Sequence, residues 1–177
     1  MPRLRLAATP LGHSDTWSGA LCMTATLVMS SPFPIVLLWG DALTQIHNDG
    51  YRVLMGVKHP AGLRQATQAC WPEVWAINEP IYTRVRAGES IAFEDALYPI
   101  TRSGVLEDAW FTLGYSPLRS AVGDVAGILV TVLETTARVH ARRLEDERVP
   151  LVSELDAAPS RVLDEVFRAR PEQRGRR

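Results

Sequence analysis

Residues 91–134 read IAFEDALYPITRSGVLEDAWFTLGYSPLRSAVGDVAGILVTVLE. Three apolar-rich runs of strand-like length lie in this stretch, at 91–100, 106–118 and 125–134. They are separated by Ser103-Gly104 and by Val122-Gly123-Asp124. Glycine beside a small polar residue is typical of a tight turn. Long neighbouring strands joined by tight turns favour an antiparallel meander, so we expect three consecutive antiparallel strands here.

The segment before this meander adds two shorter strands. The run PIVLLW at 34–39 is wholly apolar and ends at Gly40-Asp41, which predicts a buried strand followed by a turn. Residues 43–47 alternate between apolar and polar, so they predict a second strand and a hairpin. Upstream, Asp15 is the expected N-cap of a first helix. The apolar stripe of that helix consists of Trp17, Leu21, Thr24 and Val28.

Helices are expected between the second and third strands. Asn48 can cap a short helix that carries Tyr51, Leu54 and Met55 on one face and ends at Gly56. Residues 64–87 form a longer helical stretch, and Pro80 should kink or split it.

This order of elements predicts an α+β fold in one domain. Because the inserted helices must cross one face, the five-stranded antiparallel sheet is expected to have the order 2-1-5-4-3. We assign 1–14 to an N-terminal arm, 15–136 to the folded domain with its N-terminal cap helix, and 137–177 to a charged helical linker and tail. Within this tail, Ser160 is expected to cap a further short helix, and residues 171–177 are expected to be disordered.

Composition excludes several classes of protein. A net charge of -1 argues against a dedicated nucleic-acid-binding protein. The richest apolar stretch, 20–39, is interrupted at 30–34, so no membrane span is expected, and the N-terminus lacks the apolar core of a signal peptide. A cytoplasmic protein is therefore expected. Cys22 and Cys70 are far apart and are interpreted as small buried side chains.

No motif of a known catalytic chemistry is present. The sequence contains no nucleophile elbow, phosphate-binding loop or dinucleotide fingerprint, so we expect no enzymatic activity. The four histidines are not spaced as metal ligands, and no metal is expected. We interpret His47 as a half-exposed sheet residue and His140 as a solvated linker residue.

Six segments, in order, resemble one subgroup of PAS domains, which lies at the N-terminus of bacterial sensor histidine kinases and related signalling proteins. They cover about two thirds of the chain and read TPLGHSDTW (9–17), SPFPIVLLWG (31–40), IHNDGYRVLMGVKHP (46–60), WPEVW (71–75), FTLGYSPLR (111–119) and VAGILVTVLETT (125–136). Lys58, the only lysine of the chain, lies in the third segment. A structural role beside the carbonyls at the end of a helix is the preferred interpretation of Lys58, and anion binding is the alternative.

The resemblance implies which residues line the domain interior and where a signal leaves it. By resemblance the interior is lined by Phe111, Leu113, Tyr115, Ile128, Val130 and Val132. These side chains suit a packed core, which is preferred, or a pocket for a small apolar ligand. No flavin or haem signature is present, since the sequence around Cys70 does not match the cysteine motif of flavin-binding PAS domains. Glu134-Thr135-Thr136 resembles the Asp-x-Thr motif at the exit of PAS domains.

The resemblance therefore implies a sensory signal-transduction module whose C-terminal signalling helix passes a signal to a histidine kinase or other signalling protein of a two-component type. No output domain follows, so we expect a module acting in trans, a remnant or a fragment. A small ligand carrier or enzyme using the inner pocket is the alternative. The stripe of the first helix, with Leu129, Thr131 and Leu133 on the outer face of the last strand, predicts a homodimer.

Overall fold

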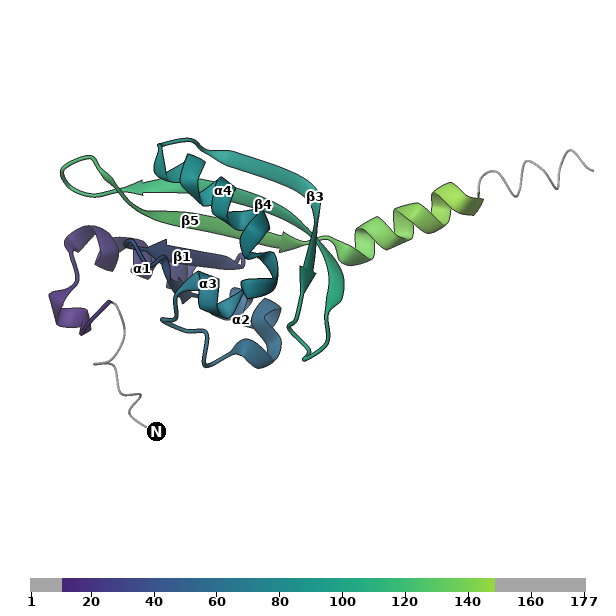
Figure 1. Cartoon of the computed structure of the whole chain (residues 1–177), viewed down its shortest axis with the longest axis horizontal. Helices are drawn as coiled ribbons and strands as arrows, with labels where there is room; N and C mark the ends of the chain where they lie inside the picture. Colours follow the sequence, from purple (N-terminus) through teal and green to yellow (C-terminus); the bar gives the residue numbers. More distant parts are fainter. Residues whose placement is uncertain (1–10, 149–177) are drawn as a thin grey trace, which may run out of the picture. The chain divides into compact units, whose positions relative to one another are not determined.

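A computed structural model describes residues 11–148 of the chain. Its centre is a five-stranded antiparallel sheet with the order β2-β1-β5-β4-β3, which confirms the predicted topology (Figure 1). The strands are β1 Ile35–Trp39, β2 Thr44–His47, β3 Ile91–Ile100, β4 Glu107–Arg119 and β5 Val125–Glu134. Gly104 and Gly123 have φ angles of 89° and 95°, so each places a left-handed residue in one of the two predicted turns.

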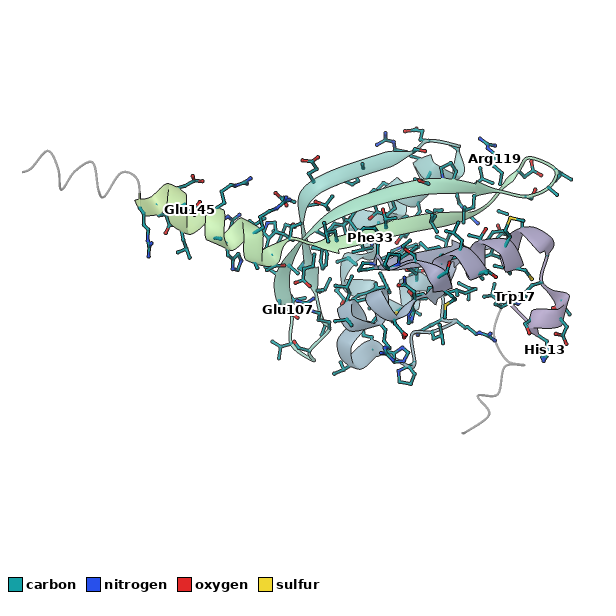
Figure 2. All side chains as sticks on the ribbon, turned by 180° about the vertical axis from the view of Figure 1, so that it is seen from behind. His13, Trp17, Phe33, Glu107, Arg119 and Glu145 are labelled. Carbon is teal, nitrogen blue, oxygen red and sulfur yellow. The ribbon has the colours of Figure 1, made fainter. Side chains whose placement is uncertain are left out.

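Helices lie on both faces of this sheet. Figure 1 shows α2, α3 and α4 in front of the sheet, and Figure 2 shows α1 on the opposite face. The α-helices are α1 Gly19–Ser30, α2 Asp49–Met55, α3 Thr67–Cys70 and α4 Trp75–Arg86. Three short 3-10 helices accompany them: η2 Ser14–Thr16 precedes α1, η3 Gly56–Lys58 follows α2, and η4 Pro72–Val74 lies between α3 and α4. The main hydrophobic core lies between α2–α4 and the inner face of the sheet.

Helix α1 begins later than predicted. Its N-cap is Ser18, whose hydroxyl accepts a hydrogen bond of 3.2 Å from the Leu21 amide, whereas Asp15 lies in η2. The predicted stripe is largely correct, because Leu21 and Val28 are buried against β1 and β2. Ala25 completes this buried face.

The inserted helices agree with the prediction except at their break. Asn48 caps α2 by accepting from the Tyr51 amide at 3.0 Å, and Gly56 ends it. The longer stretch is broken at Trp71, not at Pro80, which remains inside α4. Trp71 has φ -126° and ψ 55°, outside the helical region, because the proline at 72 disfavours helical geometry in the residue before it.

The chain divides after Thr136 into two units. Residues 136–148 are helical, and the helix predicted at 160 and the tail lie outside the described residues. Among residues 11–148, no helix is long and apolar enough to cross a membrane.

Candidate functional site

A cavity of about 70 Å³ lies between the inner face of the sheet and α2–α4. Sixteen side chains from the sheet and from α2, α3, α4 and their connections form its wall. They are Val36, Leu38, Tyr51, Leu54, Thr67, Trp71, Val74, Asn78, Tyr82, Tyr98, Ile100, Phe111, Leu113, Tyr115, Val130 and Val132.

Five of the six residues expected in the interior line this cavity. The sixth, Ile128, is fully buried in the same core cluster but does not line the cavity. The wall is more polar than the sequence suggested, because besides Tyr115 it carries three further tyrosines, Asn78 and Thr67. Sequence reasoning missed Asn78, although a signal was present: with Ile81, Tyr82 and Val85 it occupies the i, i+3, i+4, i+7 positions of one helix face.

Asn78, Tyr98 and Tyr115 form a polar clasp on the cavity wall. The Asn78 Oδ1 atom lies 3.2 Å from each tyrosine hydroxyl, and the two hydroxyls lie 3.1 Å apart. Two hydroxyl hydrogens cannot serve three contacts at once, so one oxygen pair in the clasp always lacks a shared hydrogen. The other polar atom of the Asn78 amide makes no hydrogen bond with any of residues 11–148.

The tyrosines of the wall are neutral. Burial raises the pKa of Tyr51, Tyr82, Tyr98 and Tyr115 above the ordinary value of 10.0. The wall contains no Asp, Glu, Lys, Arg or His side chain. The cavity is therefore uncharged near neutral pH and offers only hydrogen bonds and apolar contact.

Lys58 holds the edge of the cavity together. Its Nζ atom donates to the Cys70 carbonyl at 2.7 Å and to Glu73 Oε1 at 2.8 Å, and it lies 4.3 Å from the centroid of the Trp71 ring. The predicted structural role is thus present, but the carbonyl belongs to the end of α3 and not to α2. Burial alone would raise the pKa of Glu73, but hydrogen bonds from Lys58 and from the Thr101 amide lower it below its ordinary value.

The exit residues are held by Arg102, which lies in the turn between β3 and β4. Its guanidinium binds both carboxylate oxygens of Glu134, at 2.6 and 2.8 Å, and donates to Glu107 at 2.9 Å. The hydrogen bonds from Arg102 hold the pKa of Glu134 below its ordinary value. The Thr136 hydroxyl donates to Glu134 and accepts from the Trp110 amide, each at 3.0 Å.

Hydrogen bonds connect the contacts of Lys58 at the cavity edge with Arg102, which holds the exit residues Glu134-Thr135-Thr136. Glu73 accepts from the Thr101 amide at 2.8 Å, and the Val57 amide donates to the Arg102 carbonyl at 2.9 Å. A continuous series of contacts therefore runs from Trp71 on the cavity wall, through Lys58 and Glu73, to Arg102 and the exit residues.

The remaining candidate residues form no reactive group. His47 is buried, not half-exposed as expected, because its side chain faces the inserted segment, where its ring lies 5.5 Å from that of His59. Burial lowers the pKa of His47. Cys70 is buried as expected, but Cys22 is exposed on α1. No group of three or more metal-binding side chains occurs within the described part of the chain.

Comparison with known proteins supports the fold. No family model and no curated protein matches the chain. Among solved structures, an RNA-binding light-oxygen-voltage receptor matches with a TM-score of 0.54 and 16% identity, over 81% of this chain and 42% of that one. The PAS domain of Bordetella pertussis BvgS matches with a TM-score of 0.52 and 20% identity, over 75% of this chain and 99% of the domain. The Rhodobacter sphaeroides LOV protein matches with a TM-score of 0.51 and 10% identity, over 67% and 68%.

At this level of identity the matches establish the fold alone. The chain spans less than half of the light-oxygen-voltage receptor that it resembles. The structural matches, the sheet order and the inserted helices together show that the chain has a PAS fold.

Proposed function

We propose that this PAS-fold chain is a sensory signalling module, in which a change at the cavity wall alters the exit at Glu134-Thr135-Thr136 and the helical residues that follow. The six side chains expected in the interior are the starting point of the candidate sensing site. The output is a histidine kinase or another signalling protein, as in the subgroup that the sequence resembles. A cytoplasmic location remains a prediction from the sequence.

The observation that carries this proposal is the series of contacts between Trp71 and the exit. The series consists of the cation–π contact of Lys58 with Trp71, the ion pairs Lys58–Glu73 and Arg102–Glu134, and the hydrogen bond from the Thr101 amide to Glu73. We expect a movement at one end to change the contacts at the next. The side chains of Lys58 and Glu73 are only 16% and 15% exposed, and they are therefore less screened than a surface pair. A ligand or partner that shifts Trp71 would bias the exit between two arrangements of this network.

Hydrogen exchange tests the coupling directly. Thr135 N donates to the Trp110 carbonyl at 2.7 Å, so its amide reports whether the exit is closed. In Lys58→Met, which removes the cation and keeps an apolar stem, we expect protection of the Thr135 amide to fall by about tenfold relative to the β5 amide of Val130. Arg84→Met is the matched control, because Arg84–Glu89 is also a short ion pair, at 2.6 Å against 2.8 Å for Lys58–Glu73, and lies outside the series.

The control variant should leave Thr135 protection unchanged. If Lys58→Met lowers protection only near residues 56–74, the cavity edge and the exit are independent and the proposed route is wrong. Equal losses at Thr135 and Val130 would also contradict it, because they would indicate general destabilisation.

A homodimer is also proposed, with a different surface from the one the sequence suggested. The stripe of α1 that was expected at the interface is used within the chain. The opposite face of α1 carries Met23 and Leu27, which are 76% and 54% exposed, and α1 contains no charged residue. Phe33 (labelled in Figure 2) and Leu133 are also exposed, at 66% and 54%, and both line one surface groove. Apolar surface of this kind is typical of an interaction site.

Light scattering on wild type and Leu27→Glu tests the dimer. The charge should convert a dimer to a monomer without unfolding it, because Leu27 makes no part of the buried face of α1. Thr26→Glu is a control on an exposed position of the same helix, and we expect a smaller effect from it. A wild type that is monomeric at millimolar concentration would contradict the proposal.

The alternative is a small ligand carrier or enzyme using the same cavity. The absence of charged side chains from the cavity wall favours the sensory module, because acid–base and nucleophilic chemistry usually needs an ionisable group at the site. Turnover of a bound compound would favour the alternative.

A further inference from the structure

We infer that the cavity selects a very small, uncharged ligand with a hydrogen-bonding group, and that Asn78 determines this selectivity. The inference rests on the proposed sensing site, but it concerns the chemistry of the ligand and can be tested without any signalling output.

The charge of the ligand follows from the wall. None of the sixteen lining residues carries a charge, and burial keeps the four tyrosines protonated. An ion in the cavity would lose its water without gaining a counter-charge, which is strongly unfavourable. The nearest cation described above, the ammonium of Lys58, already binds Glu73 and the Cys70 carbonyl. Anions and cations are therefore both excluded.

The polar group of the ligand follows from the clasp. Asn78 is 8% exposed, and one atom of its amide has no partner among residues 11–148. This result does not depend on which amide atom is oxygen, because only one of the two faces Tyr98 and Tyr115. The indole N–H of Trp71 and the hydroxyl of Tyr51 add a second polar pair to the cavity wall. A ligand that is both donor and acceptor, such as a primary amide or an alcohol, satisfies these groups better than a hydrocarbon does.

The size of the cavity limits both the ligand and its affinity. A cavity of about 150 Å³ accommodates the six carbons of benzene, or roughly 25 Å³ for each atom. At that ratio the cavity of about 70 Å³ holds about three non-hydrogen atoms, or four with slight relaxation of the wall. Even the most efficient ligand of four atoms binds with a dissociation constant no lower than about 40 µM. We therefore expect a ligand of this size to occupy the cavity only at high micromolar to millimolar concentration.

Acetamide, acetate and acetamidinium form a matched set of probes, since each has four non-hydrogen atoms and nearly the same shape. We expect amide shifts of the cavity residues in heteronuclear NMR to saturate with acetamide. Acetate and acetamidinium should bind at least tenfold more weakly at pH 7. Asn78→Leu, which keeps the volume and removes both polar atoms, should weaken acetamide binding at least tenfold.

Two further variants separate binding from folding. Tyr98→Phe removes one hydroxyl of the clasp with little change in volume, and it should also weaken acetamide binding. It replaces Asn78→Leu as the test if that variant does not fold. Val74→Leu narrows the cavity without changing its polarity, and should also weaken binding. Any of three results would overturn the inference. Acetate could bind as tightly as acetamide, acetamide could fail to bind up to 100 mM, or both clasp variants could bind acetamide as tightly as the wild type does. If Lys58→Met left Thr135 protection unchanged, the proposed signalling route would fail, but the acetamide binding results would be unaffected, so the two proposals can fail separately.

Discussion

Replacing Arg102 by methionine should destabilise the domain by about 2–3 kcal/mol at pH 7. The guanidinium donates three charge-assisted hydrogen bonds, two to Glu134 and one to Glu107, and its side chain is only 21% exposed. A hydrogen bond to a charged group contributes about 1.5–3 kcal/mol when buried, and solvent screening reduces this at partly exposed positions. The stability lost in Arg102→Met should therefore be less than the sum of three buried hydrogen bonds, but clearly more than the stability lost when a surface ion pair is removed.

Urea denaturation followed by tryptophan fluorescence measures this loss. Arg84→Met is the control, because Arg84 and Glu89 form an equally short pair at 58% and 50% exposure, and its loss of stability should be much smaller than that of Arg102→Met. Arg102→Lys should fall between the wild type and Arg102→Met, since lysine keeps the charge but cannot bind both oxygens of Glu134 in a planar fork. Equal losses in Arg102→Met and Arg84→Met would refute the reasoning that burial strengthens the exit contact.

The same contact should weaken in acid. The folded-state pKa of Glu134 is lowered, so its stabilising effect is fully present above its unfolded value near 4.5 and is lost as pH falls through the folded pKa. The difference in unfolding free energy between wild type and Arg102→Met should therefore shrink below about pH 4.5. A difference that stays constant down to pH 2 would show that the ion pair does not cause it.

Three further predictions concern other parts of the chain. Deletion of 137–177 should shift the melting temperature by only a few degrees, corresponding to about 1 kcal/mol, and insoluble protein would contradict this. Gly62→Ala should destabilise by about 1–3 kcal/mol in urea denaturation, because the added Cβ would overlap the Met55 side chain, whereas Gly19→Ala meets no atom within 4 Å and should not destabilise. Labelled ATP with magnesium should not label the protein, and label that disappears in His140→Ala would contradict the prediction that the chain is not a kinase.

The sheet could be predicted from sequence because its signals are local. Four of the five strands are continuous apolar-rich runs, β2 alternates between apolar and polar residues, and the turns at Gly104 and Gly123 mark the boundaries between the last three strands. The start of α1 was misplaced because Asp15 and Ser18 are both good caps, and local sequence does not distinguish them. The helical stretch was predicted to break at Pro80, but it breaks before Pro72. A proline disfavours helical geometry in the residue before it, and here that residue is Trp71.

The site was less predictable because its parts meet only in three dimensions. Asn78 lies 20 residues from Tyr98 and 37 from Tyr115, and no periodicity connects them. The same is true of Lys58, whose partners belong to the end of α3 and to η4. The pattern of His47 resembled a half-exposed strand, because the sequence does not show that the inserted segment covers β2. Pocket linings and packed cores have the same composition, so only the structure could separate Ile128 from its five neighbours.

The occupied ammonium of Lys58 also makes the chain simple to probe chemically. No second lysine occurs among its 177 residues, so a lysine-specific protease has one target, the bond after residue 58. That bond lies beside the cavity edge, and the side chain that the protease must capture is 16% exposed and bound to Glu73. Cleavage into fragments 1–58 and 59–177 would therefore require this segment to open. The rate of that single cut would report the opening of the cavity edge on an ordinary gel, without labels or substitutions.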